Sequence, residues 1–79
     1  MAKARVTIMP KSGVLDPQGK AIEGALGSLG FEGVTGVRQG KVIELTLDAE
    51  GDAAREAAEK MADKLLANPV METYRVEIE

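Results

Sequence analysis

Histidine and cysteine are both absent from this chain of 79 residues. The most common general base and the most reactive nucleophile of enzyme active sites are therefore missing, and a zinc site of the usual kind cannot be built. Ser12 follows Lys11, and a Ser–Lys pair can act as nucleophile and base. Adjacent residues in a loop seldom hold that geometry, so we favour a loop serine beside a solvated lysine and predict no catalytic residue.

A series of carboxylates between positions 50 and 63 is a second candidate for chemistry, as a metal site. Its members are Glu50, Asp52, Glu56, Glu59 and Asp63. They alternate with Arg55, Lys60 and Lys64, and Glu56 stands four residues before Lys60, the spacing of a helical ion pair. This pattern is typical of a solvated, salt-bridged helix face. We therefore predict no metal in this chain.

Two places could bind an anion. Gly40 and Lys41 follow Arg38 closely, but the chain has no G-x-x-x-x-G-K-[ST] pattern, so a hairpin turn with basic flanks is the simpler interpretation. A helix start is predicted at Asp16 and Pro17, and free N–H groups there can hold a phosphate. Asp16 already offers an oxygen to those groups, and its charge repels anions. Capping of the helix is the better interpretation.

Gly19 lies inside that helix, where glycine costs roughly 0.5–1 kcal/mol relative to alanine. Gly24 and Gly27 add to the cost in the same helix. Either these are tolerated weak positions near a capped end, or another segment approaches the helix closely. The sequence leaves both interpretations open.

Composition narrows the class of protein. The net charge is −3, the sequence pI is about 4.9, and one Tyr, one Phe and no Trp are present. A basic patch with stacking aromatic residues is the usual sign of nucleic-acid binding, so we predict no nucleic-acid partner. No apolar run approaches the roughly twenty residues that span a bilayer, and the first nine residues lack the apolar core of a signal peptide. We expect a soluble, intracellular protein without a membrane partner.

The chain is also small. A single domain, residues 1–79, is expected, and folding at this length buries only about 60–65% of the surface of the unfolded chain. Such a core is marginal without disulfides or metals. A homo-oligomer or a subunit of a larger complex is therefore favoured.

Hydrophobic periodicity predicts four strands and two helices. The strands are expected at 5–9, 34–38, 42–47 and 73–79, with a hairpin turn at 39–41 between the second and the third. The first helix runs from its cap at Asp16 to Gly30, with an apolar stripe at Ile22, Ala25, Leu26 and Leu29. The second carries Ala54, Ala57, Ala58, Met61 and Leu65 on one face and is stopped by Asn68 and Pro69.

The order β-α-β-β-α-β predicts an α+β fold. Two split βαβ units suggest a ferredoxin-like sandwich, a four-stranded antiparallel sheet with both helices on one face. The opposite face would then be polar and of mixed charge. It would carry Arg5, Thr7, Glu44, Thr46, Arg75 and Glu77.

Three stretches resemble the PurS family. They are G-V-L-D-P-Q-G at 13–19, V-R-Q-G-K at 37–41 and L-L-A-N-P-V-M-E-T-Y at 65–74. PurS proteins are small subunits of phosphoribosylformylglycinamidine synthase, also called formylglycinamidine ribonucleotide synthetase. The resemblance covers nearly the whole chain, with three separated motifs in order. Met71 departs from the isoleucine that is more usual in the family.

The resemblance implies a cytoplasmic role in de novo purine synthesis. An ATP-dependent ligase there converts formylglycinamide ribonucleotide to formylglycinamidine ribonucleotide, with glutamine as the ammonia source. A large subunit carries the substrate chemistry, with ATP and Mg, and a glutaminase subunit releases ammonia. The small subunit bridges them and helps ammonia pass. Its expected partners are therefore the large subunit, the glutaminase and itself, as a dimer or tetramer; the isolated chain would have no activity.

The resemblance also implies partner or assembly contacts at the motif positions. These are Lys11, Asp16, Pro17, Gly19, Arg38, Gly40, Lys41, Asn68 and Pro69. An alternative function stays open: a stand-alone regulatory module of similar fold that binds a small metabolite at a dimer interface.

Overall fold

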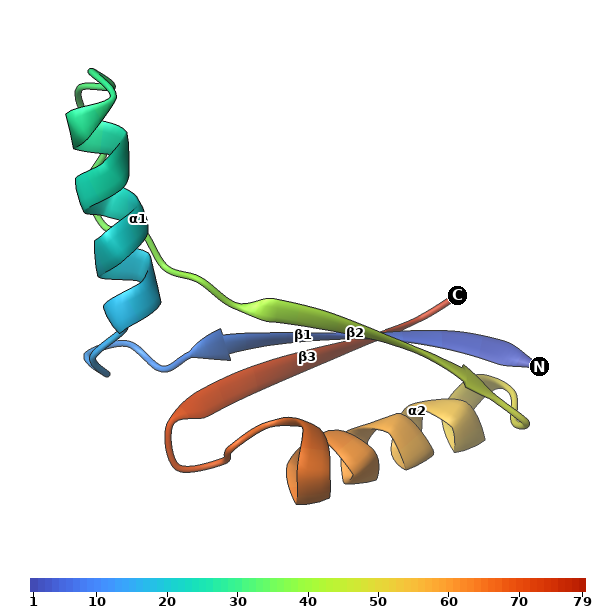
Figure 1. The fold of residues 1–79 in the computed structure, drawn as a ribbon. Helices are drawn as coiled ribbons and strands as arrows, with labels where there is room; N and C mark the ends of the chain where they lie inside the picture. The colour runs from blue at the N-terminus through green and yellow to red at the C-terminus, as the bar shows by residue number, and fades with distance from the viewer.

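A three-stranded antiparallel sheet forms the body of the protein (Figure 1). The computed structural model describes residues 1–79. The strands are β1 (Ala2–Pro10), β2 (Lys41–Leu47) and β3 (Glu72–Ile78), in the order β2-β1-β3. At the centre of the sheet Val6 is opposite Ile43 on one side and Val76 on the other. Three of the four predicted strands are confirmed, and β1 is longer than expected.

The two helices, α1 (Pro17–Ser28) and α2 (Gly51–Met61), lie where the sequence predicts them. Asp16 is the N-cap of α1 and Pro17 its first residue. At the other end, the N–H groups of Gly30 and Phe31 donate to carbonyls of the last turn, so the helix stops as expected. A π-helical turn, Ala62–Leu66, continues α2 and ends just before the extended Ala67 and the predicted stop at Asn68.

The placement of α1 is the main departure from the predicted sandwich. In Figure 1, α1 extends away from the body beyond one end of β1, and α2 alone lies along the sheet. The molecule measures 47 × 24 × 15 Å, and its radius of gyration is 15.7 Å, against about 12 Å for a compact chain of this length. The prediction of two helices on one face of the sheet is therefore wrong for the single chain. We call residues 16–40, α1 and the segment that returns from it, the arm.

The fourth strand, predicted at 34–38, is also absent, as is the hairpin at 39–41. No strand is found between 29 and 40, and β2 pairs with β1 instead. Glu23 of α1 explains this, because its Oε1 accepts the N–H groups of Gly36 (3.1 Å) and Val37 (3.2 Å). Amides that a strand would offer to a neighbouring strand are bonded to the helix. The return segment therefore follows α1 rather than the sheet.

The core lies between α2 and the sheet. Val6 and Ile8 of β1 are its largest fully buried side chains, and Ala54, Ala58 and Ala62 pack against the sheet from α2 and the π turn. Small side chains on the helix allow it to approach the sheet closely. α2 contacts β1 and β3, so Ile43, Leu45 and Leu47 on β2 stay only partly buried.

The apolar face predicted for the second helix divides into two stripes. Ala54, Ala58 and Ala62 are buried, whereas Met61 and Leu65 are 41% and 82% exposed. For Leu65 the cause is the π turn, in which Ala67 N–H donates to Ala62 O, five residues back; Met61 precedes this turn. The wider turn delays each following side chain around the helix axis. Leu66 packs against the core in place of Leu65, so the prediction for Leu65 and Met61 is wrong.

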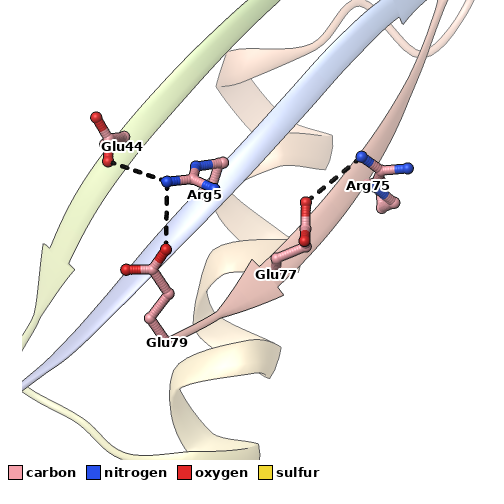
Figure 2. A network of polar contacts seen from close by, with 5 residues as sticks. All are labelled: Arg5, Glu44, Arg75, Glu77 and Glu79. Carbon is pink, nitrogen blue, oxygen red and sulfur yellow. Dashed lines mark hydrogen bonds and ion pairs between the residues drawn. The ribbon is translucent and has the colours of Figure 1, made fainter.

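The face of the sheet away from α2 is polar, as predicted. In Figure 2, Arg5 of β1 reaches Glu44 of β2 (3.8 Å) and Glu79 (3.2 Å), and Arg75 contacts Glu77 within β3 (3.4 Å). These side chains are partly or largely exposed, and such pairs stabilise by about 0–1 kcal/mol each. They make this face compatible with water.

Neither α1 nor α2 combines the length and the apolar composition that a membrane-spanning helix needs.

Candidate functional site

The residues predicted for partner or assembly contacts gather at one end of the sheet. There β1 ends, α1 begins, and β2 and β3 start. We call this region the junction; it comprises Lys11, Asp16, Pro17, Gly19, Arg38, Gly40, Lys41, Asn68 and Pro69. It connects the arm to the body, and its contacts fix how the two are placed relative to each other.

Asp16 joins the two parts of the arm, α1 and the segment that returns from it. Gly19 N–H donates to its Oδ1 (3.0 Å), and Gln39 N–H donates to its Oδ2 (2.9 Å). The pKa of Asp16 is lowered from its usual value, first by the hydrogen bond from Gln39, then by that from Gly19, with a smaller contribution from the Arg38 charge. Gln39 Nε2 also donates to Gln18 Oε1 (2.7 Å). The carboxylate thus caps α1 and ties the return segment to its first turn.

Gly19 is the only buried residue of α1. A Cβ atom at this position would stand 2.5 Å from the carbonyl oxygen of Val37 and 2.5 Å from Asp16 Oδ2. Of the two interpretations left open, close approach is therefore correct at Gly19, and the approaching segment belongs to the same chain. Nothing lies within 4 Å of a Cβ at Gly24 or Gly27, so these two are the tolerated positions. A bulky residue at position 19 would therefore disturb the arm itself, because it would collide with Val37 and Asp16 of the same chain.

Gly40 has a comparable role where β2 begins. A Cβ atom there would overlap Ile8 O and Met9 Sδ of β1, so the return segment can cross the end of β1 only at a glycine. Arg38 donates from its guanidinium to the carbonyl of Pro10. Lys41 is exposed and opposite Ile8 in the β1–β2 ladder. The tight crossing replaces the predicted hairpin turn.

Asn68 and Pro69 form the turn that leads into β3. Asn68 Oδ1 accepts the N–H of Val70 (3.0 Å), and Asn68 N–H donates to Glu72 Oε1 (2.7 Å). Lys11 N–H donates to Met71 O (2.8 Å), which extends the β1–β3 pairing beyond the strands. The turn is thereby fixed to the start of the loop that leads to the arm.

Two open cavities bring part of the junction together. One, of about 460 Å³, is lined by Lys11, Asp16 and Arg38 among others, and a second, of about 270 Å³, by Asp16, Gln39 and Asn68. Ser12 also lines the larger cavity, but no hydrogen bond joins it to Lys11. No group of three potential metal ligands occurs in the structure. The junction therefore offers hydrogen bonds and charge, without an activated nucleophile.

Some residues that contact the junction or the arm were not foreseen. Glu23 and Gln39 make long-range hydrogen bonds, and Glu72 makes a local one to Asn68; each is polar with no distinctive spacing. Only the family-like motif at 37–41 could have pointed to Gln39. The ion pair predicted between Glu56 and Lys60 is absent. Arg55 instead donates to Val76 O (3.0 Å) and joins α2 to β3.

Comparison with known proteins shows which family shares this sequence and architecture. The family model described as PurS, phosphoribosylformylglycinamidine (FGAM) synthase, matches residues 3–79. The Mycobacterium leprae phosphoribosylformylglycinamidine synthase subunit PurS is 47% identical over 76 residues, which cover 96% of this chain and 94% of the relative.

Solved structures agree over the full length. The crystal structure of Methanocaldococcus jannaschii PurS has a TM-score of 0.90 at 42% identity and covers 100% of this chain and 96% of the other. A chain of the Thermotoga maritima PurLQS structure has a TM-score of 0.85 at 34% identity, with 100% and 99% covered. The similarity includes the arm. The chain therefore belongs to the PurS family of phosphoribosylformylglycinamidine synthase subunits.

Proposed function

We propose that this chain joins the large subunit and the glutaminase of phosphoribosylformylglycinamidine synthase in the cytoplasm, and that it supports the transfer of ammonia between them in purine synthesis. The M. jannaschii relative is described as a subunit of formylglycinamide ribonucleotide amidotransferase in the purine biosynthetic pathway. The T. maritima neighbour comes from a PurLQS structure. ATP and Mg belong to the large subunit in this proposal, and this chain needs no cofactor.

One observation carries the proposal: the arm presents large apolar side chains to solvent. Leu29 is 74% exposed and Phe31, the only phenylalanine of the chain, is 59% exposed. Exposed apolar patches on small proteins mark interaction sites. The side chains of Asp16, Arg38 and Asn68 in the junction are meanwhile bonded within the chain, so they hold the arm rather than perform a reaction. Family membership gives no support to a stand-alone regulatory module.

Self-association is part of the proposal. The partly buried residues on β2 are on the same face of the sheet as α2, which packs chiefly against β1 and β3. A ferredoxin-like sandwich has its second helix over that part of the sheet. We propose that α1 of a second copy covers them, so that the two-helix layer is completed between chains in a dimer or tetramer. Sedimentation at micromolar concentration should show this oligomer, and Leu29→Ser with Phe31→Ser should shift it toward monomer. A monomeric native chain would contradict this part.

The bridging role is tested by reconstitution. The large subunit and the glutaminase are mixed with and without this chain, and amidine formation is measured from glutamine and, separately, from an ammonium salt. Omission should abolish the glutamine-driven rate and leave much of the ammonium-driven rate, because free ammonia is lost to water unless it is delivered between sites. Equal loss of both rates would mean that the chain supports the ligase site itself. No loss of either would refute the proposed function.

A further inference from the structure

A stripe along α2 and the π turn that continues it is a second apolar surface, separate from the arm. Ala57, Met61 and Leu65 follow one another at four-residue spacing, with Lys60 and Lys64 between them. Together these five residues line a shallow groove of about 460 Å³. We call it the α2 groove.

Leu65 is exposed because of the π turn. In a regular helix Leu65 would continue the face that contains Ala58, seven residues earlier, and would meet the core. The i→i+5 bond from Ala67 to Ala62 instead places Leu66 in the core and leaves Leu65 82% exposed. π turns are rare in proteins and occur often at functional sites. A leucine held in water by such a turn needs a partner to become buried.

The charges around the α2 groove indicate what that partner carries. Lys60 and Lys64 form no ion pair in this chain, although the chain has a net charge of −3. Two unpaired lysines beside an apolar stripe complement an apolar surface rimmed by Asp or Glu. A second copy fits poorly, because a two-fold contact centred on Met61 would bring the same lysines of both copies into one interface.

We infer that the α2 groove is the docking surface for another subunit of the synthase, which presents an apolar centre rimmed by carboxylates. The inference rests on the proposed function and adds to it a second surface, used by a different partner from the arm. Leu65 would be the buried anchor of this contact. Lys60 and Lys64 would steer the encounter and fix its register.

The test compares matched substitutions at fully accessible positions. Leu65→Ser removes the anchor, and Val70→Ser, at a residue 78% exposed outside the groove, is its control. Lys64→Glu reverses one charge, and Lys3→Glu makes the same change on the polar face of the sheet. Each chain is immobilised and titrated with the purified large subunit, with the glutaminase and with both together, in the presence of ADP, Mg²⁺ and glutamine.

We expect Leu65→Ser to weaken binding by at least tenfold in Kd, as loss of an anchor residue does, with no change in melting temperature or sedimentation. Lys64→Glu should weaken binding at low salt, and this difference should shrink as salt rises. Val70→Ser and Lys3→Glu should bind like the native chain. If the native chain and Leu65→Ser bind equally, the inference is overturned and the proposed function stands.

Two other results separate the remaining possibilities. If Leu65→Ser loses self-association and keeps its affinity for the other subunits, a second copy occupies the groove and the inference is overturned. If the native chain binds neither subunit, the proposed function fails, and the inference fails with it.

Discussion

The three glycines of α1 should respond in opposite directions to the same substitution. Gly24→Ala and Gly27→Ala place a methyl group in open space. Each should stabilise the helix by up to about 1 kcal/mol, the usual advantage of alanine over glycine inside a helix. Gly19→Ala gains from the same propensity but places its Cβ 2.5 Å from the carbonyl of Val37. We expect it to destabilise the arm.

The size of the effect follows from the overlap at Gly19. An ordinary contact is near 3.4 Å, so a Cβ at 2.5 Å forces the return segment to retreat. The bonds from Gly36 and Val37 to Glu23 and from Gln39 to Asp16 then lengthen together. Overpacking of this kind costs roughly 1–3 kcal/mol. Because helix propensity contributes similarly to both variants, Gly19→Ala and Gly24→Ala should differ by about this amount.

The assay is urea unfolding of each variant followed by circular dichroism, together with hydrogen exchange of the α1 amides. Hydrogen exchange reports on the arm even if it opens without the body. For a domain of this size 1 kcal/mol corresponds to about 4–8 °C in melting temperature. Exchange in α1 should slow in Gly24→Ala and accelerate in Gly19→Ala. The explanation of Gly19 would be wrong if Gly19→Ala were as stable as Gly24→Ala.

Two further predictions concern the junction and the core. Because the pKa of Asp16 is lowered on folding, its contribution is complete above the unfolded value of about 3.9 and is lost as the pH falls below it. Asp16→Asn keeps an acceptor for Gly19 N–H but not for Gln39 N–H, so between pH 2.5 and 6 its melting temperature should depend less on pH than that of the native chain; parallel curves would contradict this. In the core, Ala58→Leu should destabilise by about 1–3 kcal/mol through overpacking, whereas Ala57→Leu, at a position that is only partly buried, should stay within about 0.5 kcal/mol. Urea midpoints measure both, and equal values would mean that the two alanine positions are equivalent.

The sheet and α2 were predictable from the sequence because their hydrophobic patterns are satisfied within one chain. Alternation along β1, β2 and β3 corresponds to a buried side that meets α2 and a polar side that carries Arg5 and Glu44. The cap at Asp16 was predictable for a similar reason, since an N-cap depends on neighbours in the sequence.

The position of α1 was not predictable, because an apolar stripe shows that a helix is covered without showing by what. Ile22 and Leu29 have the spacing of a helix packed on its own sheet, yet they are exposed in the single chain. Residues 34–38 have the composition of a strand. Their amides are bonded to Glu23 across the arm, and a single glutamate gives no sequence signal for that contact.

The same limit applied to the site residues. The motif residues gather at the junction, but their type did not reveal that Gly19 and Gly40 closely approach backbone of the same chain. A sequence that requires a glycine for close approach does not show whether the approaching backbone belongs to the same chain or to a partner. Only the placement of Val37 and Ile8 decides between the two.

These observations change how the motif residues serve assembly. The junction was expected to form a contact surface, a prediction that stays untested, and its hydrogen bonds set the direction of the arm relative to the sheet. Two apolar surfaces, one on the arm and one on α2, lie on different parts of the molecule, and a bridging subunit must hold such surfaces in a fixed relation. A substitution at Asp16, Gly19 or Gly40 should therefore impair assembly by moving the arm, without removing a contact. Substitutions at Leu29 or Leu65 should remove contacts without moving the arm.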